Sequence, residues 1–386
     1  MAKILLTGGG SGGHFYPLLA VAEKLKEIIK DEDIELIYCG PNDQYTNELK
    51  QLDIKTIHIL PSKMRRYFSL ANFLEIPKFL IGLIEALIKL YFIMPDVIFS
   101  KGGPGSLPVL LAGYFYMIPI IIHESDAMPS FTTSFSQHFV KKIEISFEET
   151  KNYLKNKEKT SLTGNPLRSE IIKNKITQSE AKKSLGFKKN LPVLVVLGGS
   201  QGAQHLNQFI FDNFENLLNH FQVFHQVGKN NLEETKLIVD NLKKEISSLM
   251  ASRYKIEGFL NSKNMALVLS AADLVLSRAG AGAIFEIAFF GKPSFLIPLP
   301  QSAQNHQKLN AYYYAQNGAA IVLEEENLKF STFILKANEI LNNPSKYETM
   351  CNAAIQFSKK DAALAIAQDI LSFIKTKNPS KQHFYF

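Results

Sequence analysis

Two glycine-rich segments, each placed between an apolar run and a helical pattern, constrain this chain more than any other feature. The first covers residues 7–14 and follows Ile4-Leu5-Leu6, and the second covers residues 197–203 and follows Val193-Leu194-Val195-Val196. Short apolar runs bounded by glycine are typical of buried parallel strands. A strand that passes through glycines into a helix leaves backbone N–H groups and the positive end of the helix dipole facing outward. Both segments therefore predict anion-binding loops suited to phosphate.

A second pair of similar segments indicates that the two halves of the chain share one plan. Residues 95–106 and 272–283 both contain an Asp, an apolar run, a Ser with a basic residue, and glycines that lead into a helical pattern. A proline and another apolar run follow in each half, at Pro119 and Pro293. Alternating strands and helices predict parallel sheets, and ligands bind beyond the carboxyl ends of such strands. We therefore predict an α/β chain of two Rossmann-like, doubly wound domains that face each other across a cleft.

The length of the chain also favours two domains, because single hydrophobic cores rarely grow beyond about 250–300 residues, and this chain has 386. The apolar pattern weakens between Asn165 and Asn190, where we expect the joint. Residues 362–374 predict a helix whose apolar residues, including Phe373, share one face. The polar residues after it predict a frayed tail.

The composition excludes several classes of protein. The two cysteines, Cys39 and Cys351, lie far apart and lack metal-ligand spacing, so we expect no disulfide framework and a reducing compartment. The first apolar run is too short for a signal peptide. The formal charge of +7 is spread along the chain, mostly as lysine, without a basic-aromatic patch, so we expect no nucleic-acid partner. Attraction to an anionic membrane surface stays open.

Residues 63–94 combine a basic start with an apolar helical pattern. Glu85 and Lys89 interrupt that pattern and Pro95 ends it. A transmembrane span needs about 20 nearly uncharged residues, and this segment falls short. We favour a mostly buried crossover helix. The alternative is a basic and apolar surface that rests on a membrane, and the two interpretations are compatible.

The first glycine loop fits neither of two well-known nucleotide motifs. No acidic residue ends the second strand, at Tyr38-Cys39-Gly40, to bind a ribose, and no Gly-Lys-Ser/Thr follows the glycines. A hydride-transfer enzyme is therefore a poor fit. The segment Asp31-Glu32-Asp33 formally matches a metal-binding DxD motif, but we expect it in a solvated turn at the sheet edge opposite the glycine loops. No metal is predicted.

Several polar residues at the predicted carboxyl edges could carry chemistry. His14 ends the first loop at a helix start, where the positive helix end favours the neutral ring that a general base needs; a histidine that only hydrogen-bonds the loop is the alternative. Glu286 is expected in the first turn of the helix that follows Ala281-Gly282-Ala283, where it could accept ribose hydroxyls or merely complement the helix dipole. Residues 304–310 offer amides suited to sugar hydroxyls. Arg168 places a permanent cation near the joint, where a diphosphate could bind.

Taken in order, these residues resemble the MurG family of peptidoglycan GlcNAc transferases within glycosyltransferase family 28. The matching motifs span nearly the whole chain: Gly8-Gly9-Gly10-Ser11-Gly12-Gly13-His14 with Pro17, Ser100-Lys101-Gly102-Gly103, His123-Glu124, Gly164-Asn165-Pro166-Leu167-Arg168, Gly198-Gly199-Ser200-Gln201-Gly202-Ala203, Ser277-Arg278-Ala279-Gly280-Ala281 with Glu286, and His306-Gln307 with Asn310. One such motif would be a weak signal, whereas the ordered set is specific.

The resemblance implies a GT-B fold. Residues 1–165 would form an acceptor-binding and membrane-facing domain completed by the C-terminal helix 360–376, residues 166–359 would bind UDP-GlcNAc, and residues 377–386 would be a flexible tail. It further implies an inverting enzyme that moves GlcNAc from UDP-GlcNAc to the MurNAc 4-hydroxyl of undecaprenyl-diphospho-MurNAc-pentapeptide (lipid I), forming lipid II in peptidoglycan synthesis. No covalent intermediate, metal or cofactor is required. The enzyme would be peripheral, on the cytoplasmic face of the inner membrane, with other cell-wall enzymes as candidate partners.

The same resemblance implies roles for individual residues. His14 is the candidate base and Glu124 the alternative, and Gly102, Gly103 and Ser106 would border the acceptor diphosphate. The residues that would contact UDP-GlcNAc are Ser11, Gly12, Gly13, Asp126, Arg168, Ser200, Leu260, Ala281, Gly282, Ala283, Ile284, Phe285, Glu286, Gln307 and Asn310.

The chain departs from the family pattern at a few positions. Ser125-Asp126 stand where the family has Gln-Asn, Pro104 replaces an aromatic residue, and Ala283 replaces a threonine. A carboxylate at Asp126 fits poorly beside a diphosphate. An inactive or weakly active homologue that binds nucleotide sugar is therefore one alternative, and a UDP-GlcNAc 2-epimerase of similar fold is another. A GT-B transferase with a diacylglycerol or a different polyprenyl acceptor is a third, which the acceptor-side motifs disfavour.

Overall fold

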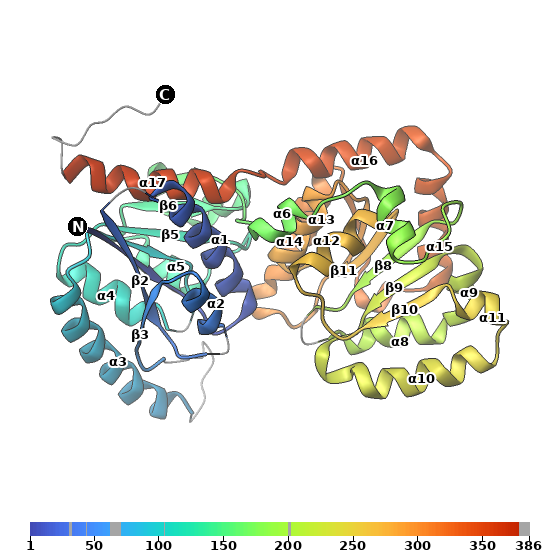
Figure 1. The fold of residues 1–386 in the computed structure, drawn as a ribbon, viewed down its shortest axis with the longest axis horizontal. Coiled ribbons are helices and arrows are strands. Elements are labelled where there is room, and N and C mark those ends of the chain that lie inside the picture. The colour runs from blue at the N-terminus through green and yellow to red at the C-terminus, as the bar shows by residue number, and fades with distance from the viewer. Residues whose placement is uncertain (31–32, 44, 62–70, 104, 200–201, 378–386) are drawn as a thin grey trace. The chain divides into compact units, whose positions relative to one another are not determined.

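The chain forms two compact units in a computed structural model that describes residues 1–30, 33–43, 45–61, 71–103, 105–199 and 202–377. Unit 1 contains residues 1–168 and the chain from Lys360 onward, and unit 2 contains residues 169–359 (Figure 1). The polypeptide therefore passes between the units twice.

Unit 1 is built on one parallel sheet of seven strands. Its strands are β1 (Ala2–Thr7), β2 (Ile34–Gly40), β3 (Lys55–His58), β4 (Val97–Ser100), β5 (Ile120–Glu124), β6 (Lys142–Ile145) and β7 (Thr160–Leu162), in the order β3-β2-β1-β4-β5-β6-β7. The strand order reverses between β1 and β4, where Thr7 lies opposite Ser100. This pair of strand ends is the topological switch point, at which ligands of open α/β sheets bind.

Helices cover both faces of this sheet. They are α1 (Gly12–Ile28), α2 (Thr46–Gln51), α3 (Ala71–Ile93), α4 (Leu107–Phe115), α5 (Phe131–Ser136) and α17 (Ala362–Lys377), with short 3₁₀ turns η1 (Glu148–Tyr153) and η2 (Lys157–Lys159). Ile4 and Leu6 pack in the core that contains α1 and α17, whereas Leu5 packs in the core that contains α3 and α4. This alternation follows from the two-residue period of a strand.

Helix α17 lies along α1 and closes the core of unit 1 (Figure 1). Ile366, Ile370 and Ile374 are buried at a four-residue spacing, which places them on one helix face. Phe373 is only partly buried and lies at the edge of this core. Residues 378–386, where a flexible tail was predicted, lie outside the described residues.

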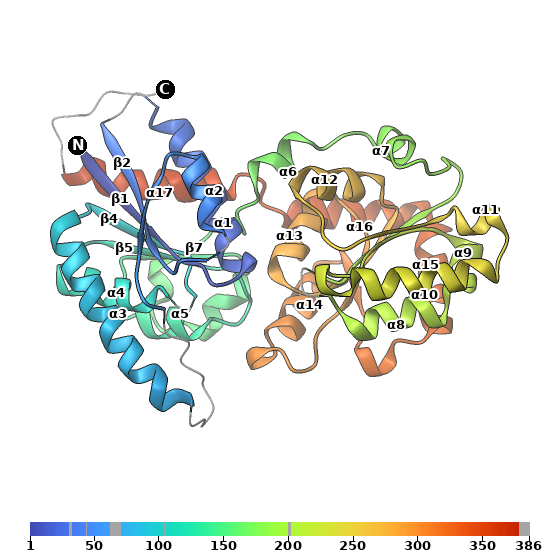
Figure 2. The ribbon, with the colours of Figure 1, turned by 60° about the horizontal axis from the view of Figure 1, so that its bottom comes forward.

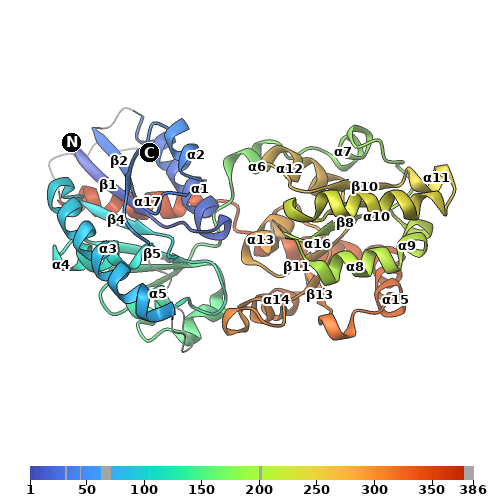
Figure 3. The same ribbon diagram turned by 90° about the horizontal axis from the view of Figure 1, so that it is seen from below.

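Unit 2 repeats the plan with a parallel sheet of six strands. They are β8 (Val193–Leu197), β9 (Gln222–Gln226), β10 (Tyr254–Glu257), β11 (Leu274–Arg278), β12 (Ser294–Ile297) and β13 (Ala320–Val322), in the order β10-β9-β8-β11-β12-β13. The helical segments are α6 (Ser169–Lys173), α7 (Gln178–Ser184), α8 (Gln204–Asp212), α9 (Phe214–His220), η3 (Lys229–Asn231), α10 (Leu232–Lys244), α11 (Ser248–Ala251), α12 (Ser262–Ala271), α13 (Ala281–Phe289), η4 (Ala303–Asn305), α14 (His306–Gln316), η5 (Glu325–Asn327), α15 (Phe330–Leu341) and α16 (Pro344–Phe357). Helices α8 and α10 lie side by side (Figure 3). The predicted class, two doubly wound parallel-sheet domains, is confirmed.

The sequence repeat corresponds to one structural joint that occurs in both units. In unit 1, the backbone N–H of Lys3 donates to the carboxylate of Asp96 at 2.9 Å, and the N–H of Asp96 donates to the carbonyl of Lys3 at 2.8 Å. In unit 2, Val193 and Asp273 exchange the same two hydrogen bonds at 2.7 and 2.9 Å. Each aspartate thus joins the start of one central strand to the start of its neighbour.

The prediction that the crossover helix in residues 63–94 is mostly buried was wrong. Helix α3 packs against α4 (Figure 2). Among its described residues, only a narrow stripe is buried, at Gly82, Ala86, Leu90 and Ile93. Five apolar side chains at four-residue spacing are 50% to 77% exposed: Ile76, Leu80, Ile84, Ile88 and Phe92. The basic residues within 63–66 lie outside the described residues. No helix in the described part of the chain is both long and apolar enough to cross a membrane.

The start of α1 and the DxD-like segment are two further local features of unit 1. Helix α1 begins at Gly12, within the glycine loop, because Ser11 adopts the extended conformation of an N-cap. Of the DxD-like segment, Asp31 and Glu32 lie outside the described residues, while the carbonyl of Asp33 accepts the N–H of Ala2 at the start of β1.

Candidate functional site

The first glycine loop joins β1 to α1 and has a backbone that only glycine supports. Gly9 and Gly10 have φ values of 122° and 84°, which side-chain-bearing residues rarely adopt. A Cβ atom on Gly9 would lie 2.9 Å from the hydroxyl of Tyr38. That hydroxyl donates to the carbonyl of Gly8 at 2.5 Å, so the second strand supports the loop directly.

Another glycine loop follows β4 in unit 1 and packs against the first loop. Gly102 and Gly103 have φ values of 76° and 96°. A Cβ atom on Gly103 would lie 2.6 Å from the carbonyl oxygen of Gly9 and 3.3 Å from Cγ of His14. Glycine at position 103 therefore permits the close approach of these two loops. It also lets the His14 ring lie against the loop that follows β4.

His14 is the third residue of α1 and is oriented by its N-cap. Its Nδ1 lies 2.8 Å from Oγ of Ser11. When Nδ1 carries the proton and donates to this hydroxyl, Nε2 is the ring atom that can accept a proton. The geometry is thus compatible with the predicted general base, and Ser11 sets the ring orientation.

Glu124, the alternative base, ends β5 and is tightly held by its neighbours. Its side chain is 4% exposed. Its oxygens accept hydrogen bonds from the N–H of Asp126 at 3.2 Å, the N–H of Ser130 at 2.7 Å and the hydroxyl of Thr133 at 2.7 Å. These three donors tie the carboxylate to the start of α5. This environment suits a structural carboxylate better than a proton acceptor.

Lys101 is a buried cation that was not singled out from the sequence as a site residue. It follows β4, is 3% exposed, and its ammonium donates to the carbonyl of His123 at 3.5 Å. Burial lowers the pKa of Lys101, and the charges of Glu124 and Asp126 oppose that shift. Burial, together with the Lys101 charge, lowers the pKa of His123 well below its usual value. The edge formed by β4 and β5 therefore holds one buried cation, two carboxylates and a neutral imidazole.

Arg168, the last residue of unit 1, stacks on an aromatic group beside the first loop. Its guanidinium carbon lies 4.4 Å from the ring centroid of Tyr16, within the range of a cation–π contact. Tyr16 in turn contacts Tyr45 edge to face, and Phe15 stacks on Tyr45. Arg168, the residue predicted to bind the diphosphate, is thus held near the start of α1.

The residues expected at the acceptor diphosphate mostly support their own loop. The hydroxyl of Ser106 is fully buried and donates to the carbonyl of Gly103 at 2.9 Å. The N–H of Gly102 donates to Oγ of Ser100 at 3.0 Å. Ser106 and Gly102 therefore fix the loop shape, and Pro104 lies outside the described residues.

In unit 2, the expected donor residues gather around α13. This helix begins at Ala281, so Glu286 lies in its second turn, and the expectation of a first-turn position was wrong. A Cβ atom on Gly282 would meet open space. Ile284 and Phe285 are fully buried, so they can offer a ligand only their backbone.

The amide residues of α14 support the same region. Asn310 is fully buried, and its side chain donates to the carbonyl of Ala279 at 3.2 Å, just before α13. The side-chain oxygen of Gln307 accepts the N–H of Leu299 at 3.1 Å. Leu260 is buried in the core that contains Ile287 of α13. Ser200 lies outside the described residues.

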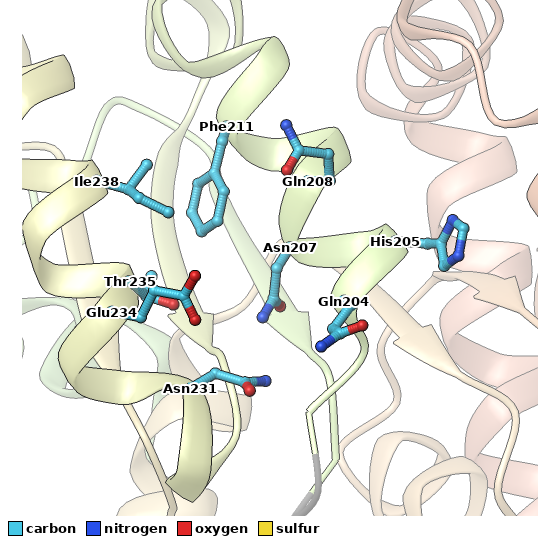
Figure 4. Close-up of a pocket in the computed structure, with 9 residues that line it drawn as sticks. All are labelled: Gln204, His205, Asn207, Gln208, Phe211, Asn231, Glu234, Thr235 and Ile238. Carbon is cyan, nitrogen blue, oxygen red and sulfur yellow. The ribbon is translucent and has the colours of Figure 1, made fainter.

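A hollow of about 330 Å³ lies between α8 and α10 (Figure 4). Figure 4 shows His205 pointing away from the other labelled side chains. The lining residues are Gln204, His205, Asn207, Gln208, Phe211, Asn231, Glu234, Thr235 and Ile238. Gly202 of the second glycine loop borders it, since a Cβ atom there would lie 2.1 Å from the Asn231 amide nitrogen. None of the expected donor residues that the structure describes lines this hollow.

Sequence comparisons identify relatives over almost the whole chain. The glycosyltransferase family 28 N-terminal domain matches residues 4–145, and the family 28 C-terminal domain matches residues 193–366. A Clostridium tetani protein named UDP-N-acetylglucosamine--N-acetylmuramyl-(pentapeptide) pyrophosphoryl-undecaprenol N-acetylglucosamine transferase is 37% identical over 347 residues, covering 89% of this chain and 91% of its own. A Treponema denticola protein of the same name is 36% identical and covers 98% of this chain and 99% of its own.

Solved structures agree on the fold. Acinetobacter baumannii MurG matches with a TM-score of 0.72 at 23% identity, covering 96% of this chain and all of its own. A UDP-GlcNAc 2-epimerase from Neisseria meningitidis matches with a TM-score of 0.66 at 16% identity over 96% of this chain and all of its own. The fold is therefore of the GT-B class, which transferases and epimerases share. Because both family domains match in order and the relatives exceed 30% identity over most of their length, the chain belongs to glycosyltransferase family 28.

Proposed function

We propose that this protein is a UDP-GlcNAc-dependent transferase that adds GlcNAc to the MurNAc of lipid I and so forms lipid II. The observation that carries this proposal is the shared name of relatives that are 36–37% identical over 89–98% of the chain. The glycine loops support it, because they offer backbone donors where a diphosphate needs them. We assign acceptor binding to unit 1 and UDP-GlcNAc binding to unit 2.

In the proposed reaction, the MurNAc 4-hydroxyl oxygen attacks C1 of GlcNAc while the bond from C1 to the UDP oxygen breaks. The hydroxyl proton passes to Nε2 of His14, and the negative charge leaves on the β-phosphate of UDP. Two contacts of His14 support it as the base: its ring hydrogen-bonds Ser11 and lies against Gly103. The three hydrogen bonds to Glu124 argue for a supporting role of that carboxylate.

UDP-GlcNAc would be held by groups that neutralise the charge of its diphosphate and by groups that hydrogen-bond its hydroxyls. Arg168 would pair with the diphosphate, together with the N-terminal backbone of α1 at residues 11–13 and Ser200. Glu286 would accept the ribose hydroxyls, and Gln307 and Asn310 would bind the GlcNAc hydroxyls. Leu260 and residues 281–285 would line the uridine, the last two through their backbone.

We also propose that unit 1 rests on an anionic membrane surface from the cytoplasmic side. The exposed stripe of α3, which consists of Ile76, Leu80, Ile84, Ile88 and Phe92, supports this proposal. Tyr114, Phe115 and Met117, at the end of the neighbouring α4, are also exposed. An apolar face of this length gains free energy when it enters the lipid headgroup region.

The decisive experiment measures transfer of labelled GlcNAc from UDP-GlcNAc to a short-chain lipid I analogue. We expect UDP release that depends on the acceptor and is unchanged by EDTA. Formation of ManNAc without acceptor would instead identify an epimerase. Binding of UDP-GlcNAc without any turnover would identify a degenerate homologue.

Membrane binding is tested separately by sedimentation with phosphatidylglycerol vesicles. Replacing Ile84 and Ile88 together by Glu should weaken binding at least about tenfold, because each half-exposed isoleucine would gain about half of the roughly 1.5–3 kcal/mol of full burial. The matched control is Leu237→Glu, on an exposed position of α10 in unit 2, which should leave binding unchanged. Equal binding of both variants would overturn the assignment of this face.

A further inference from the structure

A carboxylate of the protein itself occupies one of the backbone donors of the first glycine loop. Oδ2 of Asp43 accepts the N–H of Gly10 at 3.0 Å, and Oδ1 accepts the N–H of Tyr45 at 3.0 Å. Asp43 is half-buried and lies after the end of β2, at the carboxyl edge of the sheet. It is absent from every motif by which the sequence resembles its family.

Asp43 is itself firmly held. Its backbone N–H donates to Oγ1 of Thr46 at 3.3 Å, and that hydroxyl donates back to the Asp43 carbonyl at 3.0 Å. Thr46 begins α2 and is buried. These hydrogen bonds tie Asp43, and with it the carboxylate that reaches the loop, to the first residue of α2.

The loop needs such an anchor because of its composition. Residues 8–13 contain five glycines and one serine, and glycine loses more conformational entropy on ordering than any other residue. Gly10 precedes Ser11, and Ser11 orients the ring of His14. The hydrogen bond at Gly10 thus fixes the chain immediately before the pair that would accept the proton.

We propose that Asp43 is a positioning residue, which holds the first glycine loop, and through Ser11 the ring of His14, in the geometry that transfer requires. This inference rests on the proposed function of His14 as the base. The carboxylate acts through a hydrogen bond to Gly10 rather than through contact with a substrate. A neutral side chain of the same shape has one acceptor oxygen, so it can keep the hydrogen bond to Gly10 or the one to Tyr45, but not both.

The test compares Asp43→Ala with Asp43→Asn. The alanine variant removes the acceptor, and kcat should fall about tenfold to a hundredfold, because misplacement of a catalytic group by an ångström has effects of this size. The KM for UDP-GlcNAc should change much less. The asparagine variant has one acceptor oxygen for the N–H groups of Gly10 and Tyr45, so its kcat should lie between those of wild type and Asp43→Ala.

Asp96→Ala is the matched control. Asp96 is also half-buried and accepts a backbone N–H, that of Lys3 at 2.9 Å, but at the opposite edge of the same sheet. This variant should lower the Tm while leaving kcat unchanged. Wild-type kcat in Asp43→Ala, or an equal loss of kcat in Asp96→Ala, would overturn the proposal.

A second measurement separates this proposal from the proposed function. Amide hydrogen exchange of residues 8–14 should be faster in Asp43→Ala than in wild type and intermediate in Asp43→Asn. This readout does not require turnover, so it remains valid if the transfer reaction proves to be different. Unchanged exchange in Asp43→Ala would show that the carboxylate does not order the loop.

Discussion

The two units share one strand order but differ in the helix that connects the two sides of each sheet. In unit 1 this crossover is α3, between β3 and β4, and in unit 2 it is α12, between β10 and β11. Helix α12 packs against α6 and α7 and is mostly buried, whereas α3 packs against α4 and exposes an apolar stripe. Because both helices make the same connection, the fold does not require that stripe. The difference indicates a surface function specific to unit 1.

The basic residue of the sequence repeat differs in the same way. Arg278 in unit 2 forms an ion pair with Glu325 at 2.7 Å. Its counterpart Lys101 in unit 1 is buried beside the carbonyl of His123, in the field of Glu124 and Asp126. Equivalent positions thus serve a local pair in one unit and a buried charge cluster at the candidate site in the other.

The largest expected effect separates the two loop–helix junctions. His14→Ala should lower kcat by about 10²–10⁴, the range typical of a lost general base. His205 lies near the start of the corresponding helix in unit 2 and is 79% exposed. His205→Ala should change kcat by about twofold or less, as expected of an exposed side chain. Similar losses in both variants would remove the functional distinction between the junctions.

The second prediction concerns the buried lysines of the two units. Lys101→Met should destabilise the protein by roughly 1–3 kcal/mol, because the buried Glu124 and the half-buried Asp126 lose the favourable charge of the ammonium group. Asp126→Asn should restore about 1–2 kcal/mol of that loss, as coupled neighbours do. Lys292 of unit 2 is also buried, and donates to the carbonyls of Ser270 and Ala272 at 3.0 and 2.8 Å.

Lys292→Met serves as the control in this double-mutant cycle. It should also destabilise the protein, but Asp126→Asn should leave its loss unchanged. Urea titrations give the unfolding free energies of wild type, the single variants and the double variants, from which the coupling energy of each lysine with Asp126 follows. The absence of coupling between Lys101 and Asp126 would contradict the cluster inferred at the end of β5.

The third prediction tests the shared aspartate joint. Asp273 accepts not only the N–H of Val193 but also Gln178 at 3.0 Å, and it pairs with Lys182 at 2.7 Å. Asp273→Ala should therefore cost about 3 kcal/mol, because it leaves a nearly buried lysine unpaired. Asp96→Ala should cost about 1 kcal/mol, the usual net value of one hydrogen bond. Equal losses in thermal or urea unfolding would mean that the added partners of Asp273 contribute nothing.

The smallest effect concerns strand β6, whose counterpart β13 carries no acidic residue. Burial, reinforced by the neighbouring charge of Asp369, raises the pKa of Glu144 to about 8. The folded state then binds a proton that the unfolded state has lost, so its stability declines as pH rises from about 5 towards 8. The slope near neutral pH should be at most about 1.4 kcal/mol per pH unit. Glu144→Gln should flatten this slope in urea unfolding measured at several pH values; an unchanged slope would assign it to other groups.

Much of the fold follows from local sequence patterns. The strands β1 and β8, the glycine loops and the repeated aspartate joint were all visible as apolar runs, glycines and spacing, because strand pleat and loop geometry depend on neighbouring residues. His14 was recognised for the same reason, since its position at a helix start is a local property. The candidate donor and acceptor roles came from the ordered motifs and remain predictions.

Other features were decided by contacts between distant segments. Apolar periodicity gave α3 its helix, but which of its sides is buried depends on α4, the neighbour that covers it. In the sequence, Lys101 looks like any lysine at a strand end, and only the packing of β4 beside β5 shows that it is buried. Likewise, no sequence pattern indicates that Asp43 accepts a hydrogen bond from Gly10. Secondary structure and fold class were therefore determined by the sequence itself through local periodicity. Burial, charge pairing and loop anchoring were decided by the tertiary structure, because they depend on which distant groups share one low-dielectric space.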